Sequence, residues 1–263
     1  MNMITTPQIL FSRPIGIFRP TIVSSLLLLI VACGFYSCSS AEPTGPLSTL
    51  ETQPGDAPRE VKLSDGTKIW LRENSRLAYP ESFAKKSRQI SLTGEAYFDV
   101  AEDSDAPFRV ALPGGAEVEV LGTRFLVNVK ADSSADVTVF EGSVTLNVSN
   151  KVLILPRGKA GTGNPADRSV AELNYRANAA AWHNNTLIFE DQPMASVVRD
   201  LEDFFEVDIY LRTEELLRCR FDGRFPDADL KTILDAMEPF NGVIWNELDN
   251  EYQLWRKSPG QCS

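Results

Sequence analysis

The sequence predicts a mostly β protein, with an all-β sandwich or solenoid-like domain followed by a small α+β domain. Three observations support this prediction. Between residues 58 and 160, apolar and polar residues alternate with a period of two, which is typical of half-buried strands. Turn signals such as Asp65-Gly66 and Glu141-Gly142 separate these short segments. Beyond residue 181, apolar residues take the spacing of amphipathic helices placed between short strands.

Short strands follow one another through residues 58–160, the first predicted domain. Their apolar positions are Val61 and Leu63, Ile69 and Leu71, Ile90 and Leu92, Phe108 and Val110, Val118 and Val120, Phe125 with Val127 and Val129, Val137 and Val139, and Val144 with Leu146 and Val148. Many short strands at this spacing predict a sandwich, a barrel or a solenoid-like stack. No helical period is present in this region.

Aromatic residues and glycines in the same region are expected to hold the β fold rather than to carry chemistry. The aromatic residues expected in the core are Trp70, Tyr97, Phe98, Phe108 and Phe125. Gly94, Gly122 and Gly142 are expected at tight turns or where two backbones approach closely.

Residues 181–257 form the second predicted domain, with the order βαββαβ and one further strand. Two apolar stripes at helical spacing indicate its helices: Met194, Val197, Val198 and Leu201, then Leu230, Ile233, Leu234 and Met237. Pro193 suits the first turn of the first helix, and Asp227 or Asp229 would cap the second. Asp249-Asn250 suits a hairpin turn between two final strands.

Residues 1–32 are predicted to be a signal peptide or membrane anchor. They contain Arg13 and Arg19 and no acidic residue, and an apolar run leads to Ala32. The run Ile30-Val31-Ala32-Cys33 resembles a bacterial lipobox, so Cys33 is the predicted lipid attachment site. The alternative is a single membrane-spanning helix, although the apolar stretch is shorter than the ~20 residues that span a bilayer.

Two stretches without a clear period are predicted to be linkers. The first covers residues 33–57, where small and polar residues are mixed with prolines, and the second covers residues 161–180. Because the basic flank of the apolar run stays in the cytoplasm, the folded body is expected in the periplasm. The predicted location is therefore the cell envelope, with a membrane anchor and a periplasmic body.

Charge and residue usage argue against several classes of function. The chain has 263 residues, with 26 Lys and Arg against 36 Asp and Glu, a formal net charge of −10. A strongly acidic surface disfavours nucleic-acid binding. The single histidine, His183, has no evident partner, and the four cysteines form neither a CxxC pair nor a zinc spacing. We therefore expect no catalytic site, no metal site and no cofactor.

Two smaller features leave alternatives open. The acidic run of residues 101–105 lacks the glycine and distal glutamate of a calcium loop, so a solvated turn is favoured over a Ca²⁺ site. Cys219 and Cys262 lie in the body, and an exported chain would permit them to pair.

Seven strings, in order, are similar to conserved strings of the FecR family. They are Leu63-Ser-Asp-Gly-Thr-Lys-Ile-Trp-Leu71, Ser75-Arg-Leu-Ala-Tyr-Pro80, Leu92-Thr-Gly-Glu-Ala-Tyr-Phe-Asp-Val100, Pro107-Phe108, Val120-Leu-Gly-Thr-Arg-Phe125, Glu141-Gly-Ser-Val144 and Leu155-Pro-Arg-Gly158. Trp182, followed by residues 187–189, resembles the junction to the family's C-terminal module, in the style of the Bacteroidota. The resemblance covers about residues 50–256.

The resemblance implies a regulator that works by protein–protein interaction. FecR-like proteins relay the state of a TonB-dependent outer-membrane transducer toward an extracytoplasmic-function sigma factor, in the manner of an anti-sigma factor. The C-terminal module resembles the short N-terminal domains of secretins and TonB-dependent receptors. The resemblance also implies a cytoplasmic anti-sigma arm before the membrane, and here the sequence departs from the family. Only about 20 residues precede the apolar run, and they include Pro7, Pro14 and Pro20.

Control of a sigma factor is therefore expected either directly or through another membrane protein. Two alternatives stay open: an envelope structural or glycan-binding lipoprotein that uses the same β fold, and a hydrolase with an acidic site.

Overall fold

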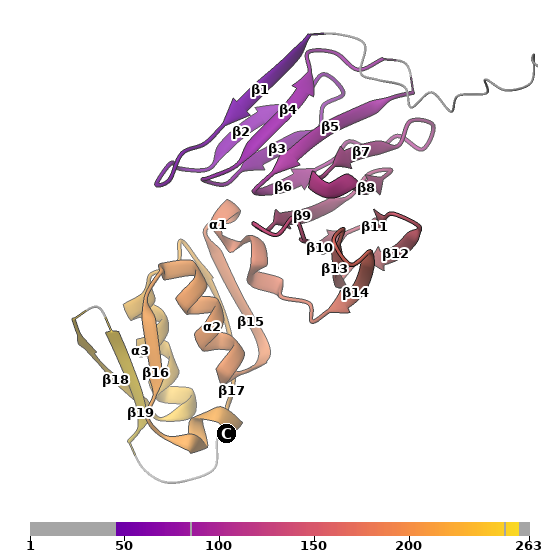
Figure 1. Ribbon diagram of the computed structural model, residues 1–263. Coiled ribbons are helices and arrows are strands. Elements are labelled where there is room, and N and C mark those ends of the chain that lie inside the picture. The colour runs from indigo at the N-terminus through magenta and orange to yellow at the C-terminus, as the bar shows by residue number, and fades with distance from the viewer. Residues whose placement is uncertain (1–45, 85, 250, 258–263) are drawn as a thin grey trace, which may run out of the picture. The chain divides into compact units, whose positions relative to one another are not determined.

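The computed structural model describes residues 46–84, 86–249 and 251–257 (Figure 1). The predicted signal or anchor segment 1–32, and with it Cys33, lies outside these residues. The described part of the chain is mostly β, with 51% of its residues in strands and 18% in helices, and its strands form no closed barrel. The predicted fold class is confirmed. No helix among the described residues has the length and hydropathy needed to cross a membrane.

The first domain is a sandwich of two seven-stranded sheets. The first sheet has the spatial order β1 (Leu47–Glu51), β4 (Arg76–Pro80), β5 (Arg88–Thr93), β7 (Phe108–Ala111), β8 (Ala116–Val120), β11 (Ser143–Val148) and β12 (Lys151–Pro156). The second has the order β14 (Ser169–Leu173), β13 (Ala160–Asn164), β10 (Ala135–Glu141), β9 (Arg124–Val129), β6 (Glu95–Asp99), β3 (Lys68–Leu71) and β2 (Arg59–Lys62). Neighbouring strands are antiparallel except β5 and β7, which are parallel.

The alternating apolar residues of both sheets form one core between them. Phe98 and Phe125 stack at its centre with ring centroids 4.7 Å apart, and Phe108 is fully buried. The prediction that Trp70 and Tyr97 join this core is wrong. Because strand residues alternate between faces, burying Ile69 inside places Trp70 on the outer face of the sheet, where it is only partly buried.

Gly94 and Gly122 lie where a residue with a side chain would not fit. Gly94 has a positive φ of 82°, and a side chain there would collide with the backbone of Ser75. A Cβ on Gly122 would lie 2.6 Å from the Cα of Glu102. Both glycines therefore hold close backbone approaches, as the sequence predicted.

The predicted linkers are wrong in part, because both contain strands. β1 lies inside residues 33–57 and pairs with β4 from Leu47 to Glu51, an edge position where backbone pairing matters more than apolar alternation. β13 and β14 lie inside or at the start of residues 161–180. β13 escaped detection because its inward positions are glycines: a Cβ on Gly161 would lie 2.6 Å from Leu153 Cδ2. The large side chains of the other sheet fill that space instead.

The second domain contains the predicted order of strands and helices. β15 (Thr186–Pro193) pairs with β17 (Arg220–Pro226), and β16 (Asp208–Leu211), β19 (Glu251–Arg256) and β18 (Val243–Leu248) form a three-stranded sheet. The helices are α2 (Met194–Phe205) and α3 (Leu230–Asn241). Their apolar stripes share a second core with Leu187, Phe189 and Phe221. Asp229, one of the two predicted caps, accepts a hydrogen bond from the Thr232 N–H at 2.9 Å. Leu248 pairs with Glu251 where β18 and β19 run antiparallel, and Asn250 of the predicted turn lies outside the described residues.

Short helices lie at three further places. η2 (Pro113–Gly115) joins β7 to β8, η4 (Glu214–Arg218) joins β16 to β17, and η3 (Ala177–Ala180) continues into the single-turn helix α1 (Ala181–Asn184). This last pair connects the two domains.

Candidate functional site at the domain junction

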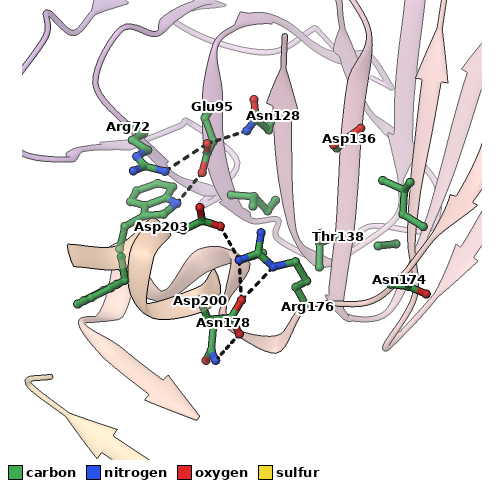
Figure 2. Close-up of a pocket in the computed structure, with 16 residues that line it drawn as sticks. Arg72, Glu95, Asn128, Asp136, Thr138, Asn174, Arg176, Asn178, Asp200 and Asp203 are labelled. Carbon is green, nitrogen blue, oxygen red and sulfur yellow. Dashed lines mark hydrogen bonds and ion pairs between the residues drawn. The ribbon is translucent and has the colours of Figure 1, made fainter. Parts of the chain in front are cut away.

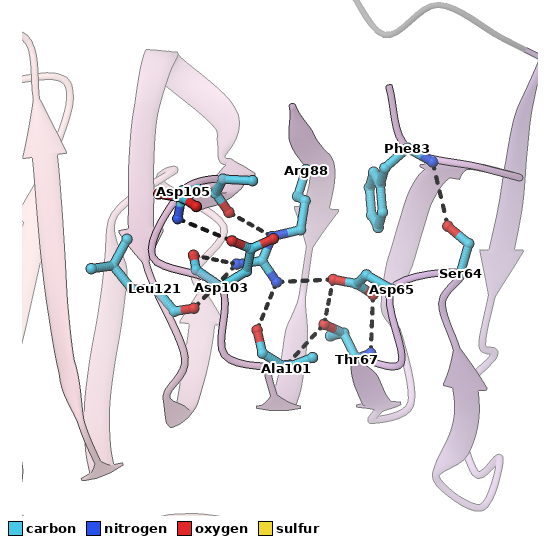
Figure 3. Close-up of polar contacts among 10 residues, drawn as sticks. Ser64, Asp65, Thr67, Phe83, Arg88, Ala101, Asp103, Asp105 and Leu121 are labelled. Atoms are coloured by element: carbon cyan, nitrogen blue, oxygen red, sulfur yellow. Dashed lines mark hydrogen bonds and ion pairs between the residues drawn. The ribbon is translucent and has the colours of Figure 1, made fainter. Parts of the chain in front are cut away.

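Polar side chains gather in two clusters, and the first surrounds Arg88 on β5 (Figure 3). The Arg88 side chain is only 5% exposed. Its Nε donates to the Ala106 carbonyl at 2.7 Å, and Nη1 donates to Asp65 Oδ2 at 3.1 Å and to the Ala101 carbonyl at 2.7 Å. Nη2 donates to the carbonyls of Asp103 at 3.4 Å and Leu121 at 3.1 Å.

This cluster gives a structural reason for the first family-like string, residues 63–71, which contains Asp65 and Thr67. Asp65 pairs with Arg88 and also accepts a hydrogen bond from the Thr67 hydroxyl at 2.8 Å, while Thr67 accepts one from the Ala101 N–H at 3.1 Å. A guanidinium has five N–H donors. Since all five meet acceptors of the same domain, none remains for a ligand. The cluster ties three loops together, and its role is structural.

The second cluster lies where the connecting segment meets the sandwich (Figure 2). Glu95, at the start of β6, accepts hydrogen bonds from Trp182 Nε1 at 2.7 Å and from Asn128 Nδ2 at 3.0 Å. Arg72 lies 3.5 Å from the same carboxylate. Trp182 belongs to α1, whose Ala181 is part of the second core. The single turn of α1 therefore contacts both domains.

A second set of polar contacts ties the connecting segment to α2. Asp200 is 2% exposed and accepts hydrogen bonds from Arg176 Nη2 at 2.5 Å, from Asn178 Nδ2 at 3.0 Å and from Gln192 Nε2 at 2.8 Å. Arg176 also reaches Asp203 at 2.6 Å. The amide of Asn178 bonds the backbone of Ile188 in both directions, at 2.9 and 2.8 Å. These contacts fix the connecting segment against β15 and α2.

Aromatic rings surround His183 on the outer face of the second sheet. Its ring stacks on Tyr97 with centroids 4.2 Å apart, and it meets Trp70 edge to face at 4.3 Å. Burial lowers the pKa of His183, against the smaller opposite influence of Asp99 and Glu60. The histidine is therefore a neutral packing residue of the junction. Tyr97 and Trp70, which the sequence analysis placed in the core, are the rings that pack against His183.

Burial also shifts the pKa of Glu95. Desolvation raises it, and Arg72 and the Trp182 hydrogen bond oppose that rise. A carboxylate held between two domains with a raised pKa is a group whose charge depends on the junction being closed.

A cavity of about 370 Å³ opens beside this network. Glu95, Asn128 and Asp136 line it from the sandwich, and Arg176 and Asp203 line it from the connecting segment and α2. Asp136 Oδ1 is buried and has no hydrogen-bond partner among the described residues, while Oδ2 of the same residue contacts Lys130 at 2.8 Å. Among the described residues, no group of acids, histidines and cysteines is arranged to bind a metal ion.

The remaining predicted residues are placed as follows. Cys33 and Cys262 lie outside the described residues. Cys219 is buried and disulfide-bonded. In the acidic run, the Asp103 carboxylate accepts a hydrogen bond from the Asp105 N–H at 3.0 Å, which is the local turn that the sequence favoured.

Sequence reasoning missed Arg88, Glu95, Arg176 and Asp200. Charged residues are rarely buried, so a charge inside a strand or a helical stripe is not expected to be internal. A signal existed only for Asp200, which shares the α2 face of the buried Val197 and Leu201.

Comparison with known proteins identifies both domains. Residues 48–145 match the model described as FecR protein, and residues 186–253 match the model described as FecR, C-terminal. The chain belongs to the FecR family. The junction of Trp182 and Glu95 thus connects the two characteristic FecR parts.

Two solved structures are similar in fold to this chain. Two crystal structures of a candidate anti-sigma factor from Parabacteroides distasonis ATCC 8503 resemble this FecR-family chain at 26% sequence identity and a TM-score of 0.52. The similarity covers 80% and 81% of this chain and 100% of each of those chains. No curated protein matches it.

Proposed function

We propose that this FecR-family chain is an anti-sigma-type signalling regulator of the cell envelope that acts by binding other proteins. It relays the state of a TonB-dependent outer-membrane transducer toward an extracytoplasmic-function sigma factor. The observation that carries the proposal is the pair of FecR family matches, in order, on a chain that resembles a candidate anti-sigma factor over 80% of its length. No enzymatic step is part of the proposal.

The junction suits a relay. A signal received by one domain can reach the other only through what joins them, and here α1 packs into the second core while Trp182 and His183 contact the sandwich. A relay through these contacts requires a second state, in which the His183 ring leaves Tyr97 and Glu95 becomes hydrated. A two-state element of this kind is what coupling between two binding events requires.

The location of the protein is a further part of the proposal. The lipobox-like run before Cys33 supports a lipid anchor, with the body in the periplasm. If Cys33 is acylated, the sigma factor is reached through another membrane protein. If the apolar run is a membrane-spanning helix instead, direct contact with the sigma factor becomes available.

Two measurements test the proposal. In the first, transcription is compared between wild type and a deletion strain, and the chain is assayed for a complex with the periplasmic domain of a TonB-dependent transducer. A specific complex together with altered transcription is the expected result. Retention of the chain on peptidoglycan, with unchanged transcription, would instead establish the glycan-binding alternative. In the second, a fatty-acid analogue should label wild type and not Cys33→Ala.

A further inference from the structure

The outer edge of β12 is the most apolar strand edge of the sandwich. β12 is the last strand of the first sheet, and within the described part of the chain it pairs only with β11, on its inner side (Figure 1). Val152 and Ile154 on this strand are 59% and 65% exposed, the two highest values among the large apolar side chains of the described chain. The other edge strands are less apolar: β2, for example, reads Arg-Glu-Val-Lys.

The pairing register shows which backbone groups face outward. Val148 pairs with Lys151 across a two-residue turn, so Lys151, Leu153 and Leu155 exchange hydrogen bonds with β11. The N–H and C=O groups of Val152 and Ile154 then point away from the sheet. They form a short ladder that another strand can complete. Pro156 has no N–H and ends that ladder.

The sequence segment that contains this edge is basic, unlike the protein as a whole. Residues 143–171 contain the basic residues Lys151, Arg157, Lys159 and Arg168, and Asp167 is their only acid, in a chain of net charge −10. Lys151 and Arg157 are exposed at the two ends of β12, and neither forms an ion pair within the described part of the chain, whereas Lys159 contacts Glu172. The edge is apolar in its centre and positive at both ends.

We propose that β12 binds an extended segment of a partner protein, which adds one strand to the first sheet. This inference rests on the proposed function in one respect, since it needs a protein partner. The segment carries two alternating apolar residues that cover Val152 and Ile154. It carries an acidic residue near each end, because Lys151 and Arg157 are about 20 Å apart along an extended strand. Main-chain hydrogen bonds give affinity and the end charges give register.

Other occupants fit less well. The terminal segments outside the described residues do not supply the pattern: residues 1–45 hold a single acid, Glu42, and residues 258–263 hold none. A second copy, paired antiparallel about Leu153, would place Lys151 of one strand diagonal to Arg157 of the other, where like charges repel. An acidic partner strand avoids that repulsion.

The test uses the full chain in detergent and a fluorescent probe peptide of alternating threonine and valine with glutamate at both ends. A second peptide with lysine at both ends is the control. Lys151→Glu/Arg157→Glu should weaken binding of the acidic peptide by about tenfold or more and favour the lysine peptide. Lys62→Glu/Lys68→Glu, which reverses two exposed charges on β2 and β3, should leave both affinities unchanged.

A second pair of variants distinguishes the contribution of the Ile154 backbone N–H to binding from that of the Ile154 side chain. Ile154→Pro removes an outward N–H and leaves the β11 ladder intact, so it should abolish peptide binding while the protein stays folded. Ile154→Thr keeps that N–H and should only weaken binding. A photo-crosslinker in the peptide should label β12.

Several results would overturn the inference: equal affinities for the two peptides, labelling of the second domain, a dimer that Ile154→Pro dissolves, or binding to phosphatidylglycerol vesicles in place of the peptide. A transducer complex that forms equally well with the charge-reversed chain would also overturn it and leave the proposed function standing. Charge-switched peptide binding by a chain that binds no transducer would support the inference and refute the proposed function.

Discussion

Two buried charges, Arg88 in the sandwich and Glu95 at the junction, have different surroundings. The guanidinium of Arg88 meets five acceptors, all within one domain. The carboxylate of Glu95 is 11% exposed, and its shortest hydrogen bond comes from Trp182, 87 residues along the chain, in a helix that belongs to the other core. The first cluster is closed, whereas the second depends on how the domains meet.

The comparison teaches that burial alone does not mark a functional residue. A closed network leaves nothing for a partner to change, so its contribution is to the stability of the fold. An open network borders a cavity and can exchange one hydrogen-bond partner for water. Function of the relay type is expected at the second kind of site.

Arg88→Ala should have the largest effect. It leaves the Asp65 carboxylate, 14% exposed, without its counter-charge and removes the donors for four carbonyls. Removing one partner of a buried ion pair costs about 3–5 kcal/mol of unfolding free energy. Urea unfolding measures this directly.

The control is Arg109→Ala. Arg109 lies 38% exposed on the neighbouring strand β7 and pairs with Glu119 at 2.7 Å. An exposed pair contributes about 0.2–1 kcal/mol. Equal losses for the two variants would contradict the distinction between a closed network and surface pairing.

Arg176→Ala should come next. Without this guanidinium, the buried Asp200 carboxylate keeps the side-chain amides of Asn178 and Gln192 as hydrogen-bond donors. Removing the charged partner of a buried group lowers the free energy of unfolding by about 1–3 kcal/mol or more. The loss should appear in the unfolding of the second domain and not of the sandwich, as hydrogen exchange of α2 and of β9 would show. Loss of protection in both would mean that the domains unfold as one.

Trp182→Phe should have a smaller effect on stability and a larger one on coupling. The ring is retained and Glu95 keeps Asn128 and Arg72 as partners, so losing the Trp182 hydrogen bond should cost about 0.5–1.5 kcal/mol of unfolding free energy. We expect each domain to keep its own stability while the protease sensitivity of residues 174–184 increases. Limited proteolysis compares the variant with Trp245→Phe, which loses a hydrogen bond to exposed Asp235 instead. Similar cleavage of the two variants would refute a role for Trp182 in holding the junction.

Much of the fold was predictable from the sequence, while the junction was not. Periodicity located most of the strands of the sandwich and both helical stripes, since apolar side chains must face a core. It missed β13, whose inward positions are Gly161 and Gly163, because glycine has no side chain to show the pattern. Trp70 was assigned to the core because it is aromatic, although its alternation with Ile69 and Leu71 places it on the opposite face of the strand. The contact of Trp182 with Glu95 spans 87 residues and depends on tertiary packing, which local sequence does not encode.

The pH dependence of the junction should show the smallest effect, because Glu95 and His183 oppose each other. The raised pKa of Glu95 means that the folded state binds its proton more tightly, so this contribution is complete below pH 4.5 and is lost as the pH rises. The lowered pKa of His183 means that its contribution is present above pH 6.5 and is lost as the pH falls through the folded-state value.

Single substitutions should separate the pH dependence of stability due to Glu95 from that due to His183. His183→Phe keeps the ring contacts with Tyr97 and Trp70 and leaves Glu95 alone, so stability relative to the double variant should fall as the pH rises from 4.5. Glu95→Gln leaves His183 alone, so stability relative to Glu95→Gln/His183→Phe should rise toward pH 6.5. Urea midpoints across this range measure both. The charged neighbours Arg72, Asp203, Asp99 and Glu60 are present in all variants and cancel in the comparison. Parallel curves for the two single variants would mean that the junction is open in solution, because both shifts depend on burial at that contact.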